Sequence, residues 1–203
     1  MSVPDMALVE GPEIFATLCA QCHGAAGEGK LEMKSPSIAG LPVWYVEDQT
    51  GRFKSGLRGY HAEDIFGLQM RAIVSSLSTE QISDAAKTVS ELASVKTTVP
   101  EGAKESIDRG RILYANRCME CHRYNGTGDV VFHSATLISL NREYIEEGLI
   151  KYRDGFRGSV PGDIYGAKMV SVTQGLTDVQ IKDLANYIGA LANGDDPRPA
   201  LER

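Results

Sequence analysis

The chain has 203 residues, of which 42% are hydrophobic and 24% are charged, and this length and composition fit one or two globular domains. Its formal net charge is −6 and both halves are mildly acidic, which argues against a nucleic acid as partner, because such proteins need a basic face. No apolar run approaches the roughly 18 to 20 residues of a membrane-spanning helix, so we expect no integral membrane span.

The sequence repeats itself at an offset of 99 residues, without a gap, along most of its length. Such a repeat predicts two like domains, the first over residues 1–98 and the second over residues 99–203, with a short linker at residues 95–102. The recurring residues include Gly11 and Gly110, Tyr45 and Tyr144, Arg58 and Arg157, and Met70 and Met169.

Both repeats are predicted to be helical, which indicates an all-α fold, and no strand pattern is convincing. The last helix of each repeat is the clearest, because Ser78 with Gln81 and Thr177 with Gln180 have the form of capping boxes. Apolar residues then follow at helical spacing. The other expected helices cover residues 10–20 and 42–54 in the first repeat, and residues 108–120 and 142–153 in the second.

All four cysteines lie in two copies of one motif, Cys-x-x-Cys-His, at residues 19–23 and 118–122. This is the attachment signature of haem c. Each thiol adds to a vinyl group of the haem to form a thioether, and the histidine binds the iron. We therefore expect two covalently bound haem c groups, held by Cys19 and Cys22 and by Cys118 and Cys121, with His23 and His122 as iron ligands.

Other sites built from paired cysteines explain the pattern less well. A four-thiolate zinc site usually separates its two pairs by about 15–20 residues, whereas the gap here runs from Cys22 to Cys118. Zinc also gives no reason for a histidine after both pairs. A thioredoxin-type redox pair would account for one copy of the motif, and it requires a βαβ pattern that the sequence lacks.

The second axial ligand of each iron must come from elsewhere in the chain. Among the six methionines only Met70 and Met169 are repeat-related, and each follows its haem histidine by 47 residues. Methionine often fills gaps in cores, but a thioether also suits iron and raises the reduction potential relative to a second histidine. We expect these two methionines to be the sixth ligands. His61 and His133 are the residues to consider if an iron has two histidine ligands.

These features resemble the c4 family of dihaem cytochromes c, in which two class I cytochrome c domains stand in tandem. The resemblance covers about residues 10–192. It rests on both haem motifs and on the run Pro36-Ser37-Ile38-Ala39-Gly40, and also on Tyr45 and Tyr144 in the second helices, Met70 before Leu77-Ser78, and Met169 before Leu176-Thr177.

The resemblance implies a periplasmic electron carrier. The N-terminus lacks the basic region and the apolar core of an export signal, and haem c is attached outside the cytoplasm in bacteria, so we expect a periplasmic protein whose signal has been removed. In the family the two haems face each other with their propionates inward. The residues that the resemblance places near those propionates are Tyr45, Tyr144, Arg58 and Arg157.

Two positions depart from the pattern of the family. In class I cytochromes the carbonyl of a proline, here Pro36, holds the haem histidine, but the second repeat has Ala135 at this place. We expect the Ala135 carbonyl to serve there with less rigidity. Tyr187 in the last helix corresponds to Thr88 in the first repeat, so the aromatic contact between the first and last helices is expected in the second domain alone.

Three functions fit these features. The first is a non-enzymatic carrier that shuttles electrons between redox partner proteins, such as a dehydrogenase, an oxidase or a reductase, through two His/Met-ligated haems. The second is the electron-accepting cytochrome subunit of a periplasmic dehydrogenase. The third is a dihaem enzyme of the thiosulfate dehydrogenase type, which is disfavoured because such enzymes use an extra cysteine as an iron ligand and this chain has four cysteines only. The sequence is compatible with a monomer and with a homodimer.

Overall fold

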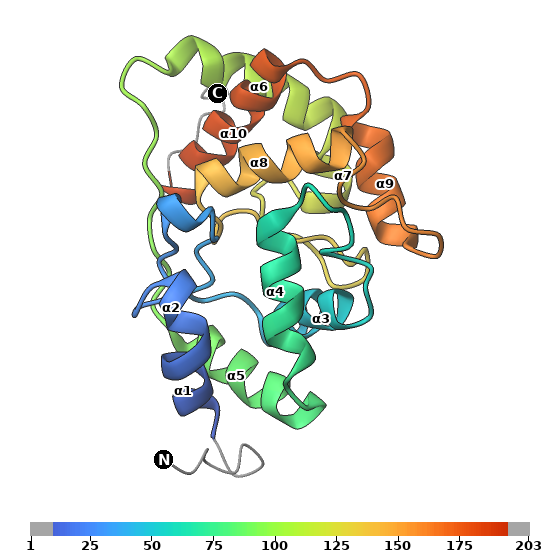
Figure 1. Ribbon diagram of the computed structural model, residues 1–203. Coiled ribbons are helices and arrows are strands. Elements are labelled where there is room, and N and C mark those ends of the chain that lie inside the picture. The colour runs from blue at the N-terminus through green and yellow to red at the C-terminus, as the bar shows by residue number, and fades with distance from the viewer. Residues whose placement is uncertain (1–9, 195–203) are drawn as a thin grey trace. The chain divides into compact units, whose positions relative to one another are not determined.

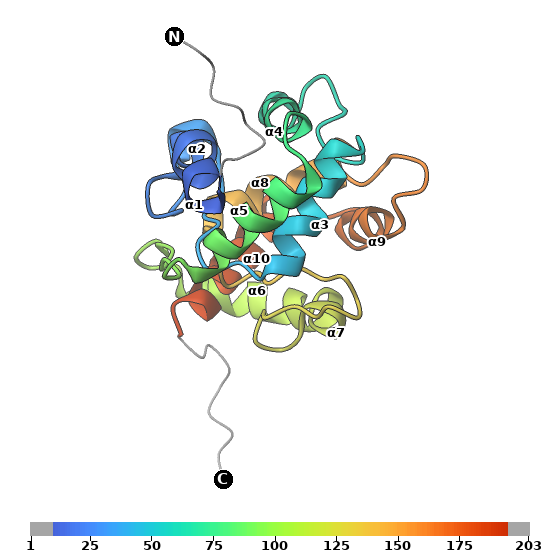
Figure 2. The same cartoon turned by 90° about the horizontal axis from the view of Figure 1, so that it is seen from below.

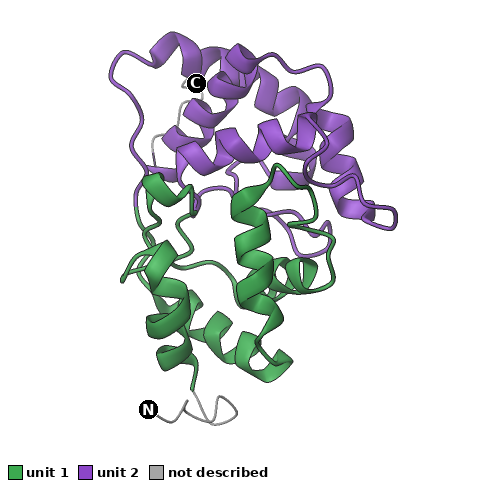
Figure 3. Cartoon of the chain, viewed as in Figure 1, with its two compact units in different colours: residues 1–95 green, residues 96–203 purple. Residues whose placement is uncertain are grey.

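A computed structural model describes residues 10–194 and divides the chain into two compact units, residues 1–95 and 96–203 (Figure 3). Both units are helical, and the described residues contain no strand beyond the isolated bridges Lys30–Ser35 and Asp129–Ser134. The predicted all-α fold is therefore confirmed. No helix within residues 10–194 is long and apolar enough to cross a membrane.

The first unit begins with a continuous helical stretch that ends in the haem motif. α1 (Gly11–Ile14) passes into a π-helical turn (Phe15–Cys19) and then into α2 (Ala20–His23). π-Helical turns are rare and often occur at functional sites, and this one ends on the first cysteine of the motif. The remaining elements are a 3-10 turn (Leu31–Met33), α3 (Val43–Lys54), α4 (Ile65–Ser75) and α5 (Thr79–Glu91) (Figure 1).

The second unit repeats this order of helices. The second unit begins at residue 96, three residues before the start that the repeat offset suggests. Thr97 contacts this unit, because its Oγ1 accepts a hydrogen bond from the backbone N–H of Arg142 at 2.9 Å. The long first helix starts earlier than predicted, and the helix predicted over residues 142–153 is found with those bounds. The elements are α6 (Lys104–Arg117), α7 (Met119–His122), α8 (Arg142–Arg153), α9 (Ile164–Thr173) and α10 (Asp178–Ala192).

The helices α4 and α9 are absent from the sequence prediction, and each begins at an aspartate. Asp64 Oδ1 accepts a hydrogen bond from the Gly67 N–H at 3.1 Å, and Asp163 Oδ1 accepts one from the Gly166 N–H at 2.7 Å. Aspartate is a preferred residue at this capping position because it satisfies an otherwise unpaired N–H of the first turn. An aspartate followed by two apolar residues was thus the available signal for both helices.

The predicted capping boxes begin the last helix of each unit. Ser78 Oγ accepts from the Gln81 N–H at 3.2 Å, and the Gln81 side chain accepts from the Ser78 N–H at 2.8 Å. The corresponding distances between Thr177 and Gln180 are 3.3 and 3.0 Å. Both predictions are confirmed, so local sequence alone sets the start of α5 and α10.

In each unit the first helix crosses the last one closely, α1 against α5 and α6 against α10 (Figure 1 and Figure 2). Gly11 and Gly110 lie at these crossings. A Cβ atom at Gly110 would lie 2.0 Å from the carbonyl oxygen of Asp183, and one at Gly11 would lie 2.3 Å from that of Asp84. Only glycine permits such a close approach of two backbones, which explains its recurrence.

The crossing in the second unit carries an aromatic contact. The ring centres of Tyr114 and Tyr187 lie 5.2 Å apart, and the Tyr114 hydroxyl donates a hydrogen bond to the Arg123 carbonyl oxygen at 2.7 Å. Burial raises the pKa of Tyr114, so the hydroxyl stays protonated. The Tyr114–Tyr187 contact confirms the ring contact predicted for the second domain. The first unit has Phe15 and Thr88 at the equivalent positions, and a threonine has no ring to pair with Phe15.

A buried carboxylate also ties α6 to α10. Asp183 accepts hydrogen bonds from Arg109 Nε at 2.7 Å, from Arg109 Nη2 at 2.9 Å and from Ser106 Oγ at 2.6 Å. Burial alone would raise the pKa of Asp183, but the hydrogen bonds from Arg109 and Ser106 outweigh it and hold the pKa below its ordinary value. The equivalent residue of the first unit, Asp84, is exposed and pairs with Lys87 at 2.9 Å.

The substitution Asp183→Asn should lower the free energy of unfolding of the second unit by about 1–3 kcal/mol at pH 7, because it removes charge-assisted hydrogen bonds from a buried site. The folded-state pKa is lowered, so this stabilisation is complete above the unfolded pKa of about 3.9 and is lost as the pH falls through the folded value. The difference between the two proteins should therefore shrink below about pH 4. Urea unfolding combined with hydrogen exchange of α6 and α10 peptides measures it.

Asp84→Asn is the matched control, because it changes the same residue type at the same repeat position on an exposed surface. It should alter the stability of the first unit by less than about 0.5 kcal/mol. Equal losses from both substitutions, or a difference that grows on acidification, would contradict the role of Asp183.

Candidate haem-binding sites

The cysteines of each motif lie within one helical turn, where side chains three positions apart are neighbours. Cys19 precedes α2, and Cys22 lies inside it. Cys118 and Cys121 have the same places relative to α7, and the four cysteines form no disulfide with one another. Burial raises the pKa of Cys19 to about 11 and that of Cys118 to about 12. Burial at Cys19 and Cys118 therefore disfavours a charged thiolate, whereas a thioether is neutral and costs little to bury.

The haem histidines are buried, and each is oriented by a backbone carbonyl. His23 Nδ1 lies 2.9 Å from the Pro36 oxygen, and His122 Nδ1 lies 3.0 Å from the Ala135 oxygen. Burial lowers the pKa of both histidines more than these hydrogen bonds raise it. A neutral imidazole that donates from Nδ1 keeps Nε2 available as a metal ligand. Alanine thus replaces the proline of the first repeat without loss of the contact.

Ser35 and Ser134 hold the loop that contains Pro36 or Ala135 against the haem motif. The sequence patterns considered above did not predict this role. Both side chains are buried. The Ser134 hydroxyl donates to the Cys121 carbonyl oxygen at 2.6 Å and accepts from the Asp129 N–H at 2.9 Å, and the Ser35 hydroxyl donates to the Cys22 carbonyl oxygen. Their recurrence at the repeat offset, next to Pro36 and Ala135, was the available signal.

A glycine in each unit lets this loop turn back onto the motif. Gly128 has φ of 70° and donates from its N–H to the His122 carbonyl oxygen at 3.1 Å. A Cβ atom at this position would lie 2.4 Å from the carbonyl oxygens of Ser134 and Ala135. Gly29 has the same conformation in the first unit, with φ of 83°. Both loops therefore reach the histidine only with glycine at this point.

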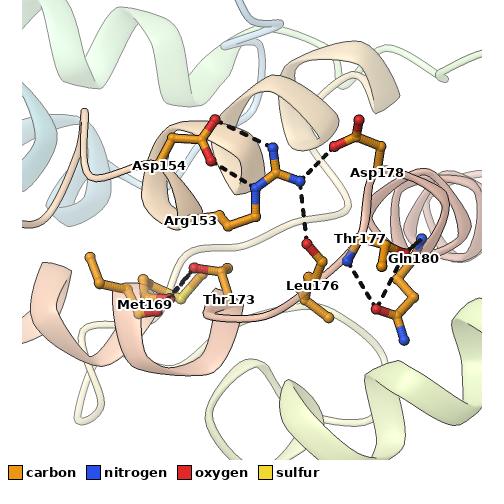
Figure 4. A network of polar contacts seen from close by, with 9 residues as sticks. Arg153, Asp154, Met169, Thr173, Leu176, Thr177, Asp178 and Gln180 are labelled. Atoms are coloured by element: carbon orange, nitrogen blue, oxygen red, sulfur yellow. Dashed lines mark hydrogen bonds and ion pairs between the residues drawn. The ribbon is translucent and has the colours of Figure 1, made fainter.

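The two methionines lie on the newly found helices, Met70 on α4 and Met169 on α9, and both side chains are partly buried. In the second unit the Thr173 hydroxyl donates to the Met169 carbonyl oxygen at 2.8 Å (Figure 4). Polar contacts therefore hold the helix at both ends, since Asp163 caps its start.

A basic side chain anchors the segment that follows each methionine helix. Arg153 Nη1 donates to the Leu176 carbonyl oxygen at 3.3 Å and to Asp178 at 2.6 Å, while its Nε donates to Asp154 at 2.8 Å (Figure 4). The equivalent Lys54 donates to the Leu77 carbonyl oxygen in the first unit. The second helix of each unit thus fixes the connection between its methionine helix and its last helix.

The residues expected near the propionates include two buried cations. Arg58 and Arg157 are each 9% exposed, and their guanidinium carbons lie 4.1 and 4.5 Å from the ring centres of Phe53 and Tyr152. Arg58 Nη1 also donates to Gln49 Oε1 at 2.6 Å.

Tyr45 is buried beside Trp44, with 5.6 Å between the ring centres, and Tyr144 is partly buried on α8. The propionate contacts of both tyrosines and both arginines stay a prediction.

The other two histidines have aromatic neighbours. His61 lies edge-on to Tyr60, with 6.3 Å between the ring centres, and its Nδ1 lies 3.3 Å from the Glu63 N–H. His133 is exposed and stacks on Tyr165 of α9 at 4.4 Å.

Comparison with known proteins agrees with the helical fold and the two haem motifs. The family described as Cytochrome c matches the chain twice, at residues 8–92 and 107–192. The chain is similar to the thiosulfate dehydrogenase electron acceptor of Thiomonas intermedia (strain K12), with 28% identity over 183 residues, which cover 86% of this chain and 79% of that protein.

Two solved structures share the fold. Cytochrome c4 of Acidithiobacillus ferrooxidans superposes with a TM-score of 0.69 at 25% identity, covering 86% of this chain and 99% of that one. The thiosulfate dehydrogenase TsdBA of Marichromatium purpuratum superposes with a TM-score of 0.66 at 25% identity over 84% of this chain, which spans 36% of that longer chain. The chain belongs to the cytochrome c family, as a dihaem electron carrier built, like cytochrome c4, from two tandem cytochrome c domains.

Proposed function

We propose that this protein accepts electrons from a dehydrogenase in the periplasm and passes them to a further redox protein. The two domains, residues 1–98 and 99–203, each bind one haem c in this proposal. Support for the donor comes from the similar protein of Thiomonas intermedia, which is a thiosulfate dehydrogenase electron acceptor, and from the match to part of a thiosulfate dehydrogenase chain. We propose the periplasm as the location, because haem c is attached outside the cytoplasm in bacteria and the donor would act in the same compartment.

The observation that supports the proposal is that each unit holds the same candidate ligands, a buried histidine of the haem motif and a partly buried methionine. A buried histidine is oriented through Nδ1, and a methionine stands on a helix anchored at both ends. Haem iron supplies reversible one-electron oxidation and reduction when it is bound. Cys19, Cys22, Cys118 and Cys121 would attach the haems through thioethers, and the irons would be bound by His23 with Met70 and by His122 with Met169.

The protein contributes orientation and exclusion of water. The Pro36 and Ala135 carbonyls hold the two imidazoles in one tautomer and one orientation. A neutral methionine sulfur in place of a second imidazole raises the reduction potential. Arg58 and Arg157, with Tyr45 and Tyr144, would hold the propionates, because a buried cation beside a buried carboxylate offsets part of the cost of burying both.

We infer that the protein is a carrier and catalyses no reaction on a small molecule. With a histidine and a methionine bound to each iron, no coordination position would be left for a substrate. All four cysteines are used in haem attachment, which leaves none to act as an iron ligand.

Carbon monoxide tests the ligand assignment. We expect the dithionite-reduced protein to show no change in its visible spectrum on addition of carbon monoxide, because methionine keeps the sixth position of each iron. Met169→Ala should bind carbon monoxide at one of its two haems, Met70→Ala at the other, and the double variant at both.

Met119→Ala is the control, because Met119 is 41% exposed and its repeat position holds Ala20. It should bind no carbon monoxide. Binding by the unmodified protein would show an open iron and would favour catalysis. Binding by His61→Ala or His133→Ala, with none by the methionine variants, would instead show bis-histidine iron.

Rapid mixing tests the donor. The oxidised protein should be reduced at both haems when it is mixed anaerobically with a thiosulfate dehydrogenase and thiosulfate, and should stay oxidised with either component alone. Failure of the complete mixture, under conditions that reduce a known acceptor, would reject this donor while the carrier function stands. Reduction by thiosulfate without the enzyme would show that the protein itself oxidises thiosulfate.

A further inference from the structure

We propose that His133 is a positioning residue for the sixth ligand of the second haem. Its stack on Tyr165 holds the Met169 helix against the haem-binding loop, which is the segment of residues 123–141 between α7 and α8. The inference rests on the proposed function, in which Met169 binds iron. It concerns the second unit alone, since the first unit has Lys34 and Phe66 at the equivalent positions, and a lysine cannot form a ring stack.

The stack joins the loop that follows the haem histidine to the helix that carries the proposed methionine ligand. His133 lies on the loop between α7, which ends at His122, and α8. Tyr165 lies in the first turn of α9, four residues before Met169. The two ring centres are 4.4 Å apart and the ring planes differ by 22°. Side chains four residues apart share one face of a helix, so His133 contacts the same face of α9 that carries Met169.

The loop beneath His133 is itself tied to the haem motif. His133 has φ of 50°, a left-handed conformation, and its N–H donates to the Val130 carbonyl oxygen at 3.1 Å. The next residue, Ser134, donates to the Cys121 carbonyl oxygen at 2.6 Å. A continuous series of contacts therefore runs from the second haem cysteine through His133 and Tyr165 to the helix of Met169.

Charged side chains also lie beside this pair. Lys168, on α9, has its ammonium nitrogen 5.4 Å from the Tyr165 ring centre. Arg123, on the loop, pairs with Asp129, and its guanidinium carbon lies 5.7 Å from the Phe132 ring centre. Because His133 is exposed and Tyr165 is partly buried, the stack is a surface contact of two aromatic rings. Its loss should free the start of α9 without unfolding the buried core.

The test is the affinity of imidazole for the oxidised protein, because exogenous imidazole competes with methionine for ferric iron. His133→Ala and Tyr165→Ala should each raise this affinity at one of the two haems by roughly 2- to 10-fold, as expected for the loss of one aromatic pair. The double variant should show no larger change than either single one, since both remove the same contact. The reduction potential of the affected haem should fall.

Two variants separate positioning from general damage. Tyr165→Phe keeps the ring and should behave as the unmodified protein does. Val131→Ala changes an 80% exposed residue of the same loop and should also leave the imidazole affinity unchanged. The other haem of every variant is an internal control.

The inference would be overturned if His133→Ala left the imidazole affinity unchanged, changed both haems equally, or had its effect reproduced by Val131→Ala. Met169→Ala distinguishes this failure from failure of the ligand assignment. If Met169→Ala opens one iron to imidazole while His133→Ala does not, only the positioning role fails. If Met169→Ala leaves both irons closed, the assignment of Met169 itself is wrong.

Discussion

Each unit depends on the close crossing of its first and last helices. At the crossing a glycine lets two backbones approach to a distance that a side chain would prevent. The first helix runs from this point directly into the Cys-x-x-Cys-His turn. A leucine, Leu77 or Leu176, connects the methionine helix to the last helix. Its carbonyl oxygen accepts a hydrogen bond from Lys54 or Arg153. The crossing therefore connects the helix of the haem motif with the element that follows the candidate methionine, although it contains none of the residues proposed to bind haem.

The two units use this frame with different reinforcement. In the second unit the crossing gains the Tyr114–Tyr187 contact and the buried Asp183 network. Its haem-binding loop also contacts the methionine helix through His133. The first unit has Phe15, Thr88 and an exposed Asp84 at the matching positions. Equal sets of candidate ligands thus stand in unequal surroundings.

Local patterns predicted most of the helices, because the signals that start a helix lie within a few residues of one another. The capping boxes at Ser78 and Thr177 and the helix over residues 142–153 were predicted on this basis. The helices of Met70 and Met169 were missed. They are short and their capping aspartates were not recognised, and the packing of α4 on α3 and of α9 on α8 supports them in the folded protein.

The sequence by itself determined the covalent chemistry, because both cysteines and the histidine of each site lie within one helical turn and need no tertiary contact to be recognised. The tertiary structure alone decided what orients and shields that chemistry. The Pro36 and Ala135 carbonyls, the Ser35 and Ser134 hydroxyls and the His133–Tyr165 stack join residues from separate elements. Such contacts form only when loops of defined length close over a packed helix, and residue type alone does not encode that geometry.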